Sequence, residues 1–266
     1  QHAVDDFFLR NQFDEVYQLA ADMGGADYIF TGDNDLEIMT RSMQINLNVI
    51  DAVRAYNVPK IFYSSSACVY SEDKQVDRNN IDCREAAAYP ANPDSEYGWE
   101  KLFAERLYMN LHKHTNTQVR IARFHNIFGP SSEYDSGREK APAALCRKVS
   151  KCTNGGSIDV YGTGEQVRSF LYITDCLDAI EDLMLSSYSA PINIGSNFTI
   201  SINDLAKKII AISGKSITIN NIDVPQTGVI ARTSNNELFD RMVGTAKKVS
   251  LPYGLSELYL WVDSQT

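Results

Sequence analysis

Paired cysteines, histidines and long apolar runs are scarce in this sequence. The five cysteines, at positions 68, 83, 146, 152 and 176, form no Cys-x-x-Cys pair, and there are only four histidines. A disulfide framework and a zinc site are therefore not expected, and we predict no metal and a reducing compartment. No apolar run approaches the roughly 18 residues of a membrane span, and no signal-peptide pattern opens the sequence. We expect a cytoplasmic protein without a membrane partner.

Basic residues are outnumbered by acidic ones. The sequence has 25 Lys and Arg against 34 Asp and Glu, a net charge of −9. This balance argues against binding to nucleic acid or to a membrane surface, but it leaves room for a local basic pocket that binds a phosphate. With 44% hydrophobic and 22% charged residues in 266 positions, the chain can form one large or two modest globular domains.

Strand and helix patterns alternate along the first half of the chain. In order, the predicted elements are helix 3–12, strand 15–21, helix 36–56, strand 60–67, helix 94–114 and strand 118–125. This alternation predicts an α/β fold with a Rossmann-like, doubly wound parallel sheet in a domain over residues 1–129.

The predicted elements become shorter after residue 129. They are helices 141–150, 174–185, 202–212 and 237–243, and strands 157–161, 169–173 and 191–195. We predict a smaller C-terminal α/β substrate domain over 130–266, with 163–190 partly returning to the first domain.

A Rossmann-like sheet normally begins with a glycine-rich turn that places the pyrophosphate of a dinucleotide at a helix N-terminus. The 15 glycines of this chain form neither Gly-x-Gly-x-x-Gly nor Gly-x-x-Gly-x-x-Gly. We therefore expect the N-terminal strands of the sheet to be absent and roughly sixty to seventy residues of the fold to precede Gln1. The choice between NAD and NADP depends on a residue in that part and stays open.

Tyr97 and Lys101 lie four residues apart in the predicted helix 94–114 and therefore share one helix face. There the ammonium of Lys101 can lower the pKa of the Tyr97 phenol, which would let the tyrosine act as a base. The pattern alone is weak, because 14 tyrosines give roughly one such pair by chance. Two further pairs begin at Tyr56 and Tyr70. Pro59 disfavours a helix across the first pair, and the second lies in the polar stretch after the predicted strand 60–67. The rival interpretation is an exposed helical tyrosine beside a solvated lysine.

A hydroxyl cluster at 64–66, followed by Cys68, ends the predicted strand 60–67. Together with Tyr97 and Lys101 these residues outline an oxidising site for a sugar nucleotide, with a thiol inside it. A cysteine after three serines is otherwise most often a small buried hydrophobic residue.

The serine cluster before Tyr97 and Lys101, with Leu19-Ala20-Ala21 earlier, resembles the extended short-chain dehydrogenase/reductase superfamily. Five blocks narrow the resemblance to the GDP-mannose 3,5-epimerase family, at residues 20–25, 65–70, 123–130, 137–144 and 166–170. The resemblance covers nearly the whole chain. It implies an NAD-dependent enzyme that inverts C3 and/or C5 of a GDP-sugar through a 4-keto intermediate, acting as a homodimer.

The resemblance also implies a role for individual residues. Tyr97 is the redox acid/base, Lys101 is its partner and a ligand of the cofactor ribose, and Ser66 orients the sugar. Cys68 and Lys140 match the family's paired acid/base groups. Ala20 and Ala21 fall at the cofactor, together with Tyr97 and Lys101. Substrate contacts are implied at Gly25, Ser66, Ala67, Cys68, Asn126, Glu139, Lys140, Ala141, Lys148, Gln166, Val167, Arg168 and Arg232.

Several of these residues also have ordinary structural interpretations. Arg168 and Arg232 suit a diphosphate because a planar guanidinium matches phosphate oxygens, and a surface salt bridge is the rival interpretation. Lys140 and Lys148 could be solvated charges of a helix. His125 is predicted to pack or hydrogen-bond at a strand end.

Two alternative functions stay open from the sequence. Another extended dehydrogenase, a sugar-nucleotide 4-epimerase or 4,6-dehydratase, would share Tyr97 and Lys101 but would usually have threonine in place of Cys68, and the dehydratases would add an acidic pair. A non-catalytic sugar-nucleotide-binding protein is favoured by the missing glycine turn, whereas the retention of every proposed catalytic residue weighs against it.

Overall fold

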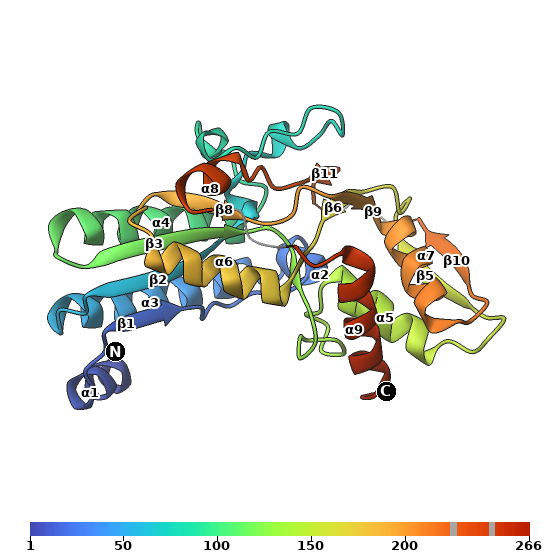
Figure 1. Cartoon of the computed structure of the whole chain (residues 1–266), viewed down its shortest axis with the longest axis horizontal. Helices are drawn as coiled ribbons and strands as arrows, with labels where there is room; N and C mark the ends of the chain where they lie inside the picture. Colours follow the sequence, from blue (N-terminus) through green and yellow to red (C-terminus); the bar gives the residue numbers. More distant parts are fainter. Residues whose placement is uncertain (224–227, 245–247) are drawn as a thin grey trace.

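The computed structural model describes residues 1–223, 228–244 and 248–266, and its largest sheet has four parallel strands (Figure 1). In spatial order these are β1 (Glu15–Gln18), β2 (Lys60–Ser66), β3 (Gln118–Phe124) and β8 (Pro191–Ile194). The central strands are buried on both faces, as is typical of a parallel sheet between two layers of helices. The predicted α/β fold with a parallel sheet is confirmed.

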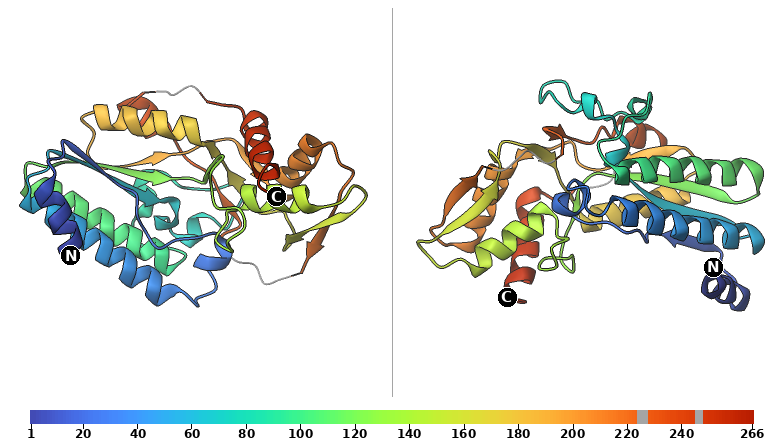
Figure 2. Two further views of the ribbon diagram at one scale, coloured as in Figure 1. Left: turned by 90° about the horizontal axis from the view of Figure 1, so that it is seen from below. Right: turned by 180° about the vertical axis from the view of Figure 1, so that it is seen from behind.

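Helices cover both faces of this sheet (Figure 2). On one face lie α3 (Asp35–Ala55) and α4 (Glu96–His114), with α1 (His2–Arg10) beside them, and on the other lie α6 (Ile173–Leu185) and α8 (Glu237–Met242). Because side chains alternate along a strand, Ile61 and Tyr63 pack with α3 and α4 whereas Phe62 packs with α6. Segments after residue 130 therefore complete the sheet layer, and they include β8 and α8 as well as α6.

A second lobe packs at the carboxyl ends of these strands. Its helices are α5 (Ala141–Lys151), α7 (Ile202–Ser213) and α9 (Leu251–Asp263), and its paired strands are β5 (Ser157–Tyr161) and β10 (Thr218–Ile222). One apolar cluster runs through all three helices and β5. The sequence analysis did not predict β10 or α9.

Three short strands link the two lobes, β11 (Ala231–Arg232), β6 (Val167–Ser169) and β9 (Thr199–Ser201). A separate pair is formed by β4 (Ile127–Phe128) and β7 (Leu171–Tyr172). The predicted single strand 169–173 is therefore wrong. Its residue Ser169 pairs with Thr199 in one sheet, whereas Leu171 pairs with Ile127 in another.

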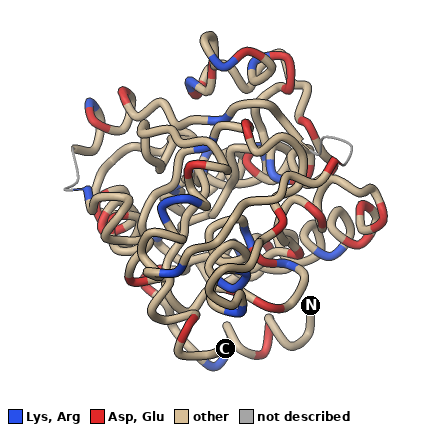
Figure 3. Tube along the Cα trace, turned by 90° about the vertical axis from the view of Figure 1, so that its right-hand side faces the viewer, with Lys and Arg blue, Asp and Glu red and all other residues tan. Residues whose placement is uncertain are grey.

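The remaining helices are a single turn long. They are α2 (Ala26–Ile29), η1 (Ala67–Val69), η2 (Glu72–Lys74) and η3 (Glu85–Ala88). The strand predicted over 15–21 ends at Gln18 because the Gln18 amide bonds both backbone groups of Ala20. Acidic and basic residues are mixed throughout the view in Figure 3. In the described part of the chain, no helix has the length and apolarity to cross a membrane.

Candidate active site

A cleft of about 490 Å³ lies between the sheet and the second lobe. Most of the predicted substrate positions line it, namely Gly25, Ser66, Ala67, Cys68, Asn126, Glu139, Lys140, Ala141, Lys148, Gln166, Arg168 and Arg232. Tyr97 lines the cleft as well. Val167 does not line it, because successive side chains of a strand point to opposite faces and its neighbours Gln166 and Arg168 face the cleft.

Tyr97 and Lys101 lie on one side of α4, beneath the cleft. The Lys101 ammonium lies 5.6 Å from the centre of the Tyr97 ring and donates a hydrogen bond of 2.9 Å to the carbonyl oxygen of Ser64. Burial raises the pKa of Tyr97, the neighbouring Cys68 adds to this, and the Ser66 hydroxyl opposes it. The pKa of Tyr97 is therefore raised, opposite to the direction predicted from its spacing with Lys101. Burial also lowers the pKa of Lys101.

The start of α4 is held against the end of β2. The Ser95 hydroxyl accepts a hydrogen bond from the backbone N–H of Gly98, so Ser95 caps the helix. Gly98 is needed for the close approach, because a Cβ there would collide with the carbonyl oxygen of Cys68. This packing brings the Cys68 thiol and the Tyr97 ring into one buried cluster. Ser66 caps the turn that carries Cys68, accepting from the Cys68 N–H at 3.2 Å.

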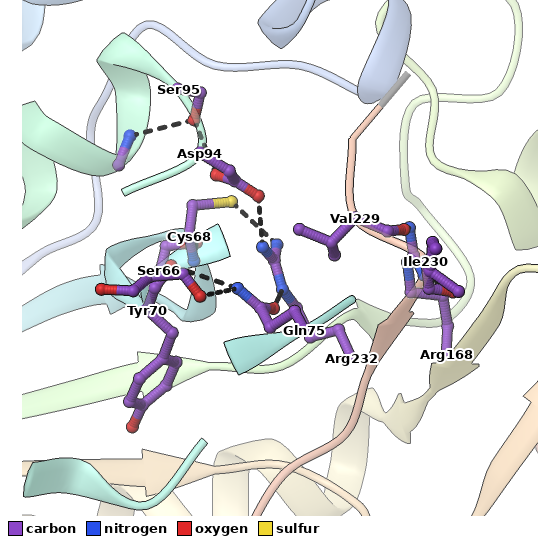
Figure 4. A network of polar contacts seen from close by, with 12 residues as sticks. Ser66, Cys68, Tyr70, Gln75, Asp94, Ser95, Arg168, Val229, Ile230 and Arg232 are labelled. Atoms are coloured by element: carbon purple, nitrogen blue, oxygen red, sulfur yellow. Dashed lines mark hydrogen bonds and ion pairs between the residues drawn. The ribbon is translucent and has the colours of Figure 1, made fainter. Parts of the chain in front are cut away.

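Arg232 joins three segments beneath the cleft (Figure 4). Its guanidinium donates to the Sγ of Cys68 at 3.2 Å, to Oδ2 of Asp94 at 2.5 Å and to Oε1 of Gln75 at 2.5 Å. Burial by itself would lower the pKa of Arg232, but the carboxylate of Asp94 raises it above its usual value. The rival interpretation of Arg232 as part of a surface salt bridge is therefore excluded, because its ion pair with Asp94 is buried. Gln75 is fully buried, and its amide also donates to the backbone of Tyr70.

Sequence reasoning missed the part that Asp94 and Gln75 play. An aspartate at the start of a helix usually suggests a helix cap, but Ser95 has that position, and the Asp94 side chain is 2% exposed against Arg232. Gln75 had no signal in the sequence, because its partner Arg232 is 157 residues away.

Arg168 lies beside Arg232 on the cleft wall, and its guanidinium donates to three carbonyl oxygens, those of Val167, Val229 and Ile230. Burial and then the like charge of Arg232 lower the pKa of Arg168 to about 10. The two guanidinium groups therefore concentrate positive charge in the cleft, although each is bound to acceptors of the chain itself.

Lys140 enters the cleft from the loop before α5. Lys140 as a whole is exposed to solvent through the cleft. Its ammonium, however, has protein around it, and this desolvation lowers the pKa of Lys140. Among the described residues the ammonium has no hydrogen bond. Glu139 accepts from Arg147 and from the Gly137 N–H, and Lys148 donates to the backbone of Asp159.

Of the remaining predicted residues, Gln166 lines the cleft, whereas Ala20, Ala21 and His125 do not. Gln166 lines it with a buried Oε1 that has no hydrogen-bond partner among the described residues. Ala20 and Ala21 follow β1 but do not line this cleft. The prediction for His125 is confirmed, because it is fully buried beside β3 and its Nε2 meets Oδ1 of Asn193 at 3.0 Å.

The residues at α4 fit a nicotinamide cofactor. An ammonium carries three N–H donors, and that of Lys101 has one hydrogen-bond acceptor among the described residues. The remaining donors lie beside Tyr97 and suit the hydroxyls of a ribose. Tyr97 and Lys101 would hold such a group, and the cofactor contact of Ala20 and Ala21 stays a prediction.

A family model describing the NAD dependent epimerase/dehydratase family matches residues 1–195. The chain belongs to this family. It is 39% identical over 252 residues to GDP-mannose 3,5-epimerase of Arabidopsis thaliana, covering 95% of the chain and 66% of that protein. It is 23% identical to GDP-L-fucose synthase of Escherichia coli, covering 97% and 83%. The chain thus spans 66% of the length of the GDP-mannose 3,5-epimerases that it matches.

Two solved structures share the fold of this chain. UDP-glucose 4-epimerase of Thermotoga maritima superimposes with a TM-score of 0.86 at 20% identity, over 99% of this chain and 82% of that one. A GDP-6-OMe-4-keto-L-xylo-heptose reductase of C. jejuni gives 0.88 at 20% identity, over 100% and 86%. The Rossmann-like fold class is thereby confirmed.

Proposed function

We propose that this protein is an NAD-dependent epimerase that inverts C3 and/or C5 of GDP-mannose through a 4-keto intermediate. The observation that carries the proposal is that one cleft gathers a phenol, a thiol and an amine, those of Tyr97, Cys68 and Lys140. The similarity to GDP-mannose 3,5-epimerases supports the same substrate.

The chemistry explains why a redox site and an acid/base pair belong together. Hydrogens on C3 and C5 of a hexose are scarcely acidic until C4 is a ketone, when both are α to a carbonyl. Bound NAD would accept the hydride from C4 and later return it. Tyr97 takes the proton of the C4 hydroxyl, and Ser66 orients that hydroxyl. The sugar ends with no net change in oxidation state.

Inverting a carbon requires a base on one face of the ring and an acid on the other. Cys68 is carried by η1 after β2, and Lys140 by the loop before α5, so the two groups come from different lobes. The lowered pKa of Lys140 favours proton exchange closer to neutrality. The positive wall of Arg168 and Arg232 suits the diphosphate.

We also propose a reducing compartment for this protein. The five cysteines are all free thiols, which suits a reducing compartment such as the cytoplasm. A cytoplasmic homodimer stays a prediction.

Deuterium exchange tests the function directly. The protein is incubated with NAD and GDP-mannose in D₂O, and the hexoses are followed by NMR. We expect deuterium at C5 and C3, inverted products and no net reduction of NAD. Tyr97→Phe should abolish all three. Turnover confined to UDP- or dTDP-sugars would overturn the guanosine assignment, and binding of GDP-mannose without exchange would favour a non-catalytic binding protein.

A further inference from the structure

Two blocks that are distant in sequence meet beside the cleft, residues 20–25 and 137–140. The carboxylate of Asp22 is 7% exposed and accepts from Nη1 of Arg138 at 3.0 Å, across 116 residues of chain. It also accepts from the Tyr28 hydroxyl at 2.9 Å. Asp22 belongs to the sheet layer and Arg138 to the loop before α5, so this ion pair bridges the two lobes.

Arg138 is fixed by more than the ion pair. Its guanidinium stacks 4.1 Å from the centre of the Tyr28 ring and donates to the Tyr28 hydroxyl at 3.0 Å. Its carbonyl oxygen accepts from the backbone N–H of Gly25 at 2.9 Å. The backbones can approach this closely because residue 25 is glycine, since a Cβ there would collide with the carbonyl oxygen of Glu139.

These contacts determine where Lys140 lies. Arg138 is tied to the sheet layer, and the next residue, Glu139, is tied to α5 by a 2.6 Å ion pair with Arg147. Lys140 follows directly and starts α5, its carbonyl accepting from the Ala144 N–H. Its ammonium has no hydrogen bond within the described chain. Its position in the cleft therefore depends on the backbone anchors on either side of it.

We propose that Asp22 and Arg138 are positioning residues that hold the Lys140 amine in reach of the sugar ring. This inference rests on the proposed function, because it gives Lys140 a proton to transfer. It also gives the blocks 20–25 and 137–140 one shared role. The first block supplies Asp22 and Gly25, and the second supplies Arg138 and Lys140.

Arg41 provides a matched control. It donates to the same carboxylate at the same 3.0 Å, and its side chain is 62% exposed against 43% for Arg138. Arg41 lies on α3, in the same layer as Asp22, and makes no hydrogen bond or ion pair with the loop 137–140 among the described residues. Replacing either arginine by glutamine removes one cation from Asp22, but only Arg138→Gln removes the side-chain contacts that link the loop to Asp22 and Tyr28.

The kinetic test separates proton transfer from hydride transfer. We expect Arg138→Gln to lower deuterium uptake at C5 and C3 about 10- to 100-fold, as is usual when a catalytic group is displaced by about 1 Å. The transient signal of reduced nicotinamide and the KM should stay at wild-type values, so the loss appears in kcat. Arg138→Lys, which keeps the charge opposite Asp22, should recover part of the rate. Arg41→Gln should leave every value unchanged.

Amide hydrogen exchange tests the anchor without any turnover. Amide hydrogens of Gly25 and of the loop 137–140 should exchange at least about tenfold faster in Arg138→Gln than in Arg41→Gln. The reason is that the hydrogen bond from the Gly25 N–H to the carbonyl oxygen of residue 138 can then open locally. Equal exchange in the two variants, or normal deuterium uptake by Arg138→Gln, would overturn the proposal. If the wild-type protein moved no deuterium into the sugar, the proposed function would fail, while amide exchange would still decide whether Arg138 holds the loop.

Discussion

The guanidinium of Arg232 donates a hydrogen bond to the thiol of Cys68 at 3.2 Å, across 164 residues of sequence. The same guanidinium is held by Asp94 and Gln75, so its orientation toward the sulfur is set by groups outside the reacting centre. The proposed acid/base thiol therefore lies beside a permanent positive charge. A negative diphosphate would be stabilised by this charge.

Removing one partner of the ion pair between Asp94 and Arg232 should destabilise the folded protein strongly. Both side chains are at least nine-tenths buried, so Asp94→Asn leaves a buried guanidinium without its carboxylate. We expect a loss of about 3 kcal/mol in the free energy of unfolding, measured by urea denaturation. Asp73→Asn, which breaks an exposed pair with Lys74, should cost less than about 1 kcal/mol. Similar costs for the two variants would contradict the buried-pair assignment.

Replacing Cys68 by alanine should separate epimerisation from redox chemistry. Removal of a positioned acid/base group is expected to lower deuterium uptake by about two to four decades. Reduced nicotinamide should still form transiently, because Tyr97, Lys101 and Ser66 remain. Cys152→Ala serves as the control, since that thiol lies outside the cleft. Normal exchange in Cys68→Ala would show that the thiol is only a packing group.

Lys140→Arg should be inactive in epimerisation although it keeps the positive charge. Burial lowers the pKa of Lys140, whereas an arginine side chain does not release its proton in proteins. We expect loss of deuterium uptake with retention of the transient nicotinamide signal. Lys151→Arg, at an exposed site paired with Asp135, should behave as wild type. Epimerisation by Lys140→Arg at the wild-type rate would exclude proton transfer by this side chain.

His125 should make the folded protein sensitive to mild acid. Burial lowers its pKa to about 3, and the nearby Arg232 and Arg123 add to this, while the contact with Asn193 opposes it. The unfolded chain takes up this proton near pH 6.5, so the stabilisation is complete above that pH and is lost as pH falls toward 3. Between pH 7 and 5 the free energy of unfolding should fall by about 2 kcal/mol from this group.

The matched variant for this prediction is His125→Gln, which keeps an amide beside Asn193 but cannot titrate. Urea denaturation at pH 7, 6 and 5 should show a shallower decline for His125→Gln than for the wild type. His114→Gln changes an exposed histidine and should leave the slope as it is. Parallel declines for wild type and His125→Gln would refute the assignment.

The parts of the site that depend on neighbouring residues could be predicted from the sequence. Tyr97 and Lys101 lie on one face of α4 because the helical period alone brings residues four apart together. The strands β2 and β3 were found because an apolar run that is buried on both faces carries its own signal. The blocks at 65–70, 137–144 and 166–170 contain residues that line one cleft in the structure.

The tertiary structure alone decided how these residues are held. Asp94 and Ser95 are equivalent as helix caps in sequence, and only the position of Arg232 turns Asp94 into an ion-pair partner. Around Phe170 the run 169–173 reads as one strand, yet its two ends pair in different sheets, because strand partners are distant in sequence. The same reason applies to Asp22 and Arg138, since a contact between two lobes depends on how the whole chain packs and has no local period.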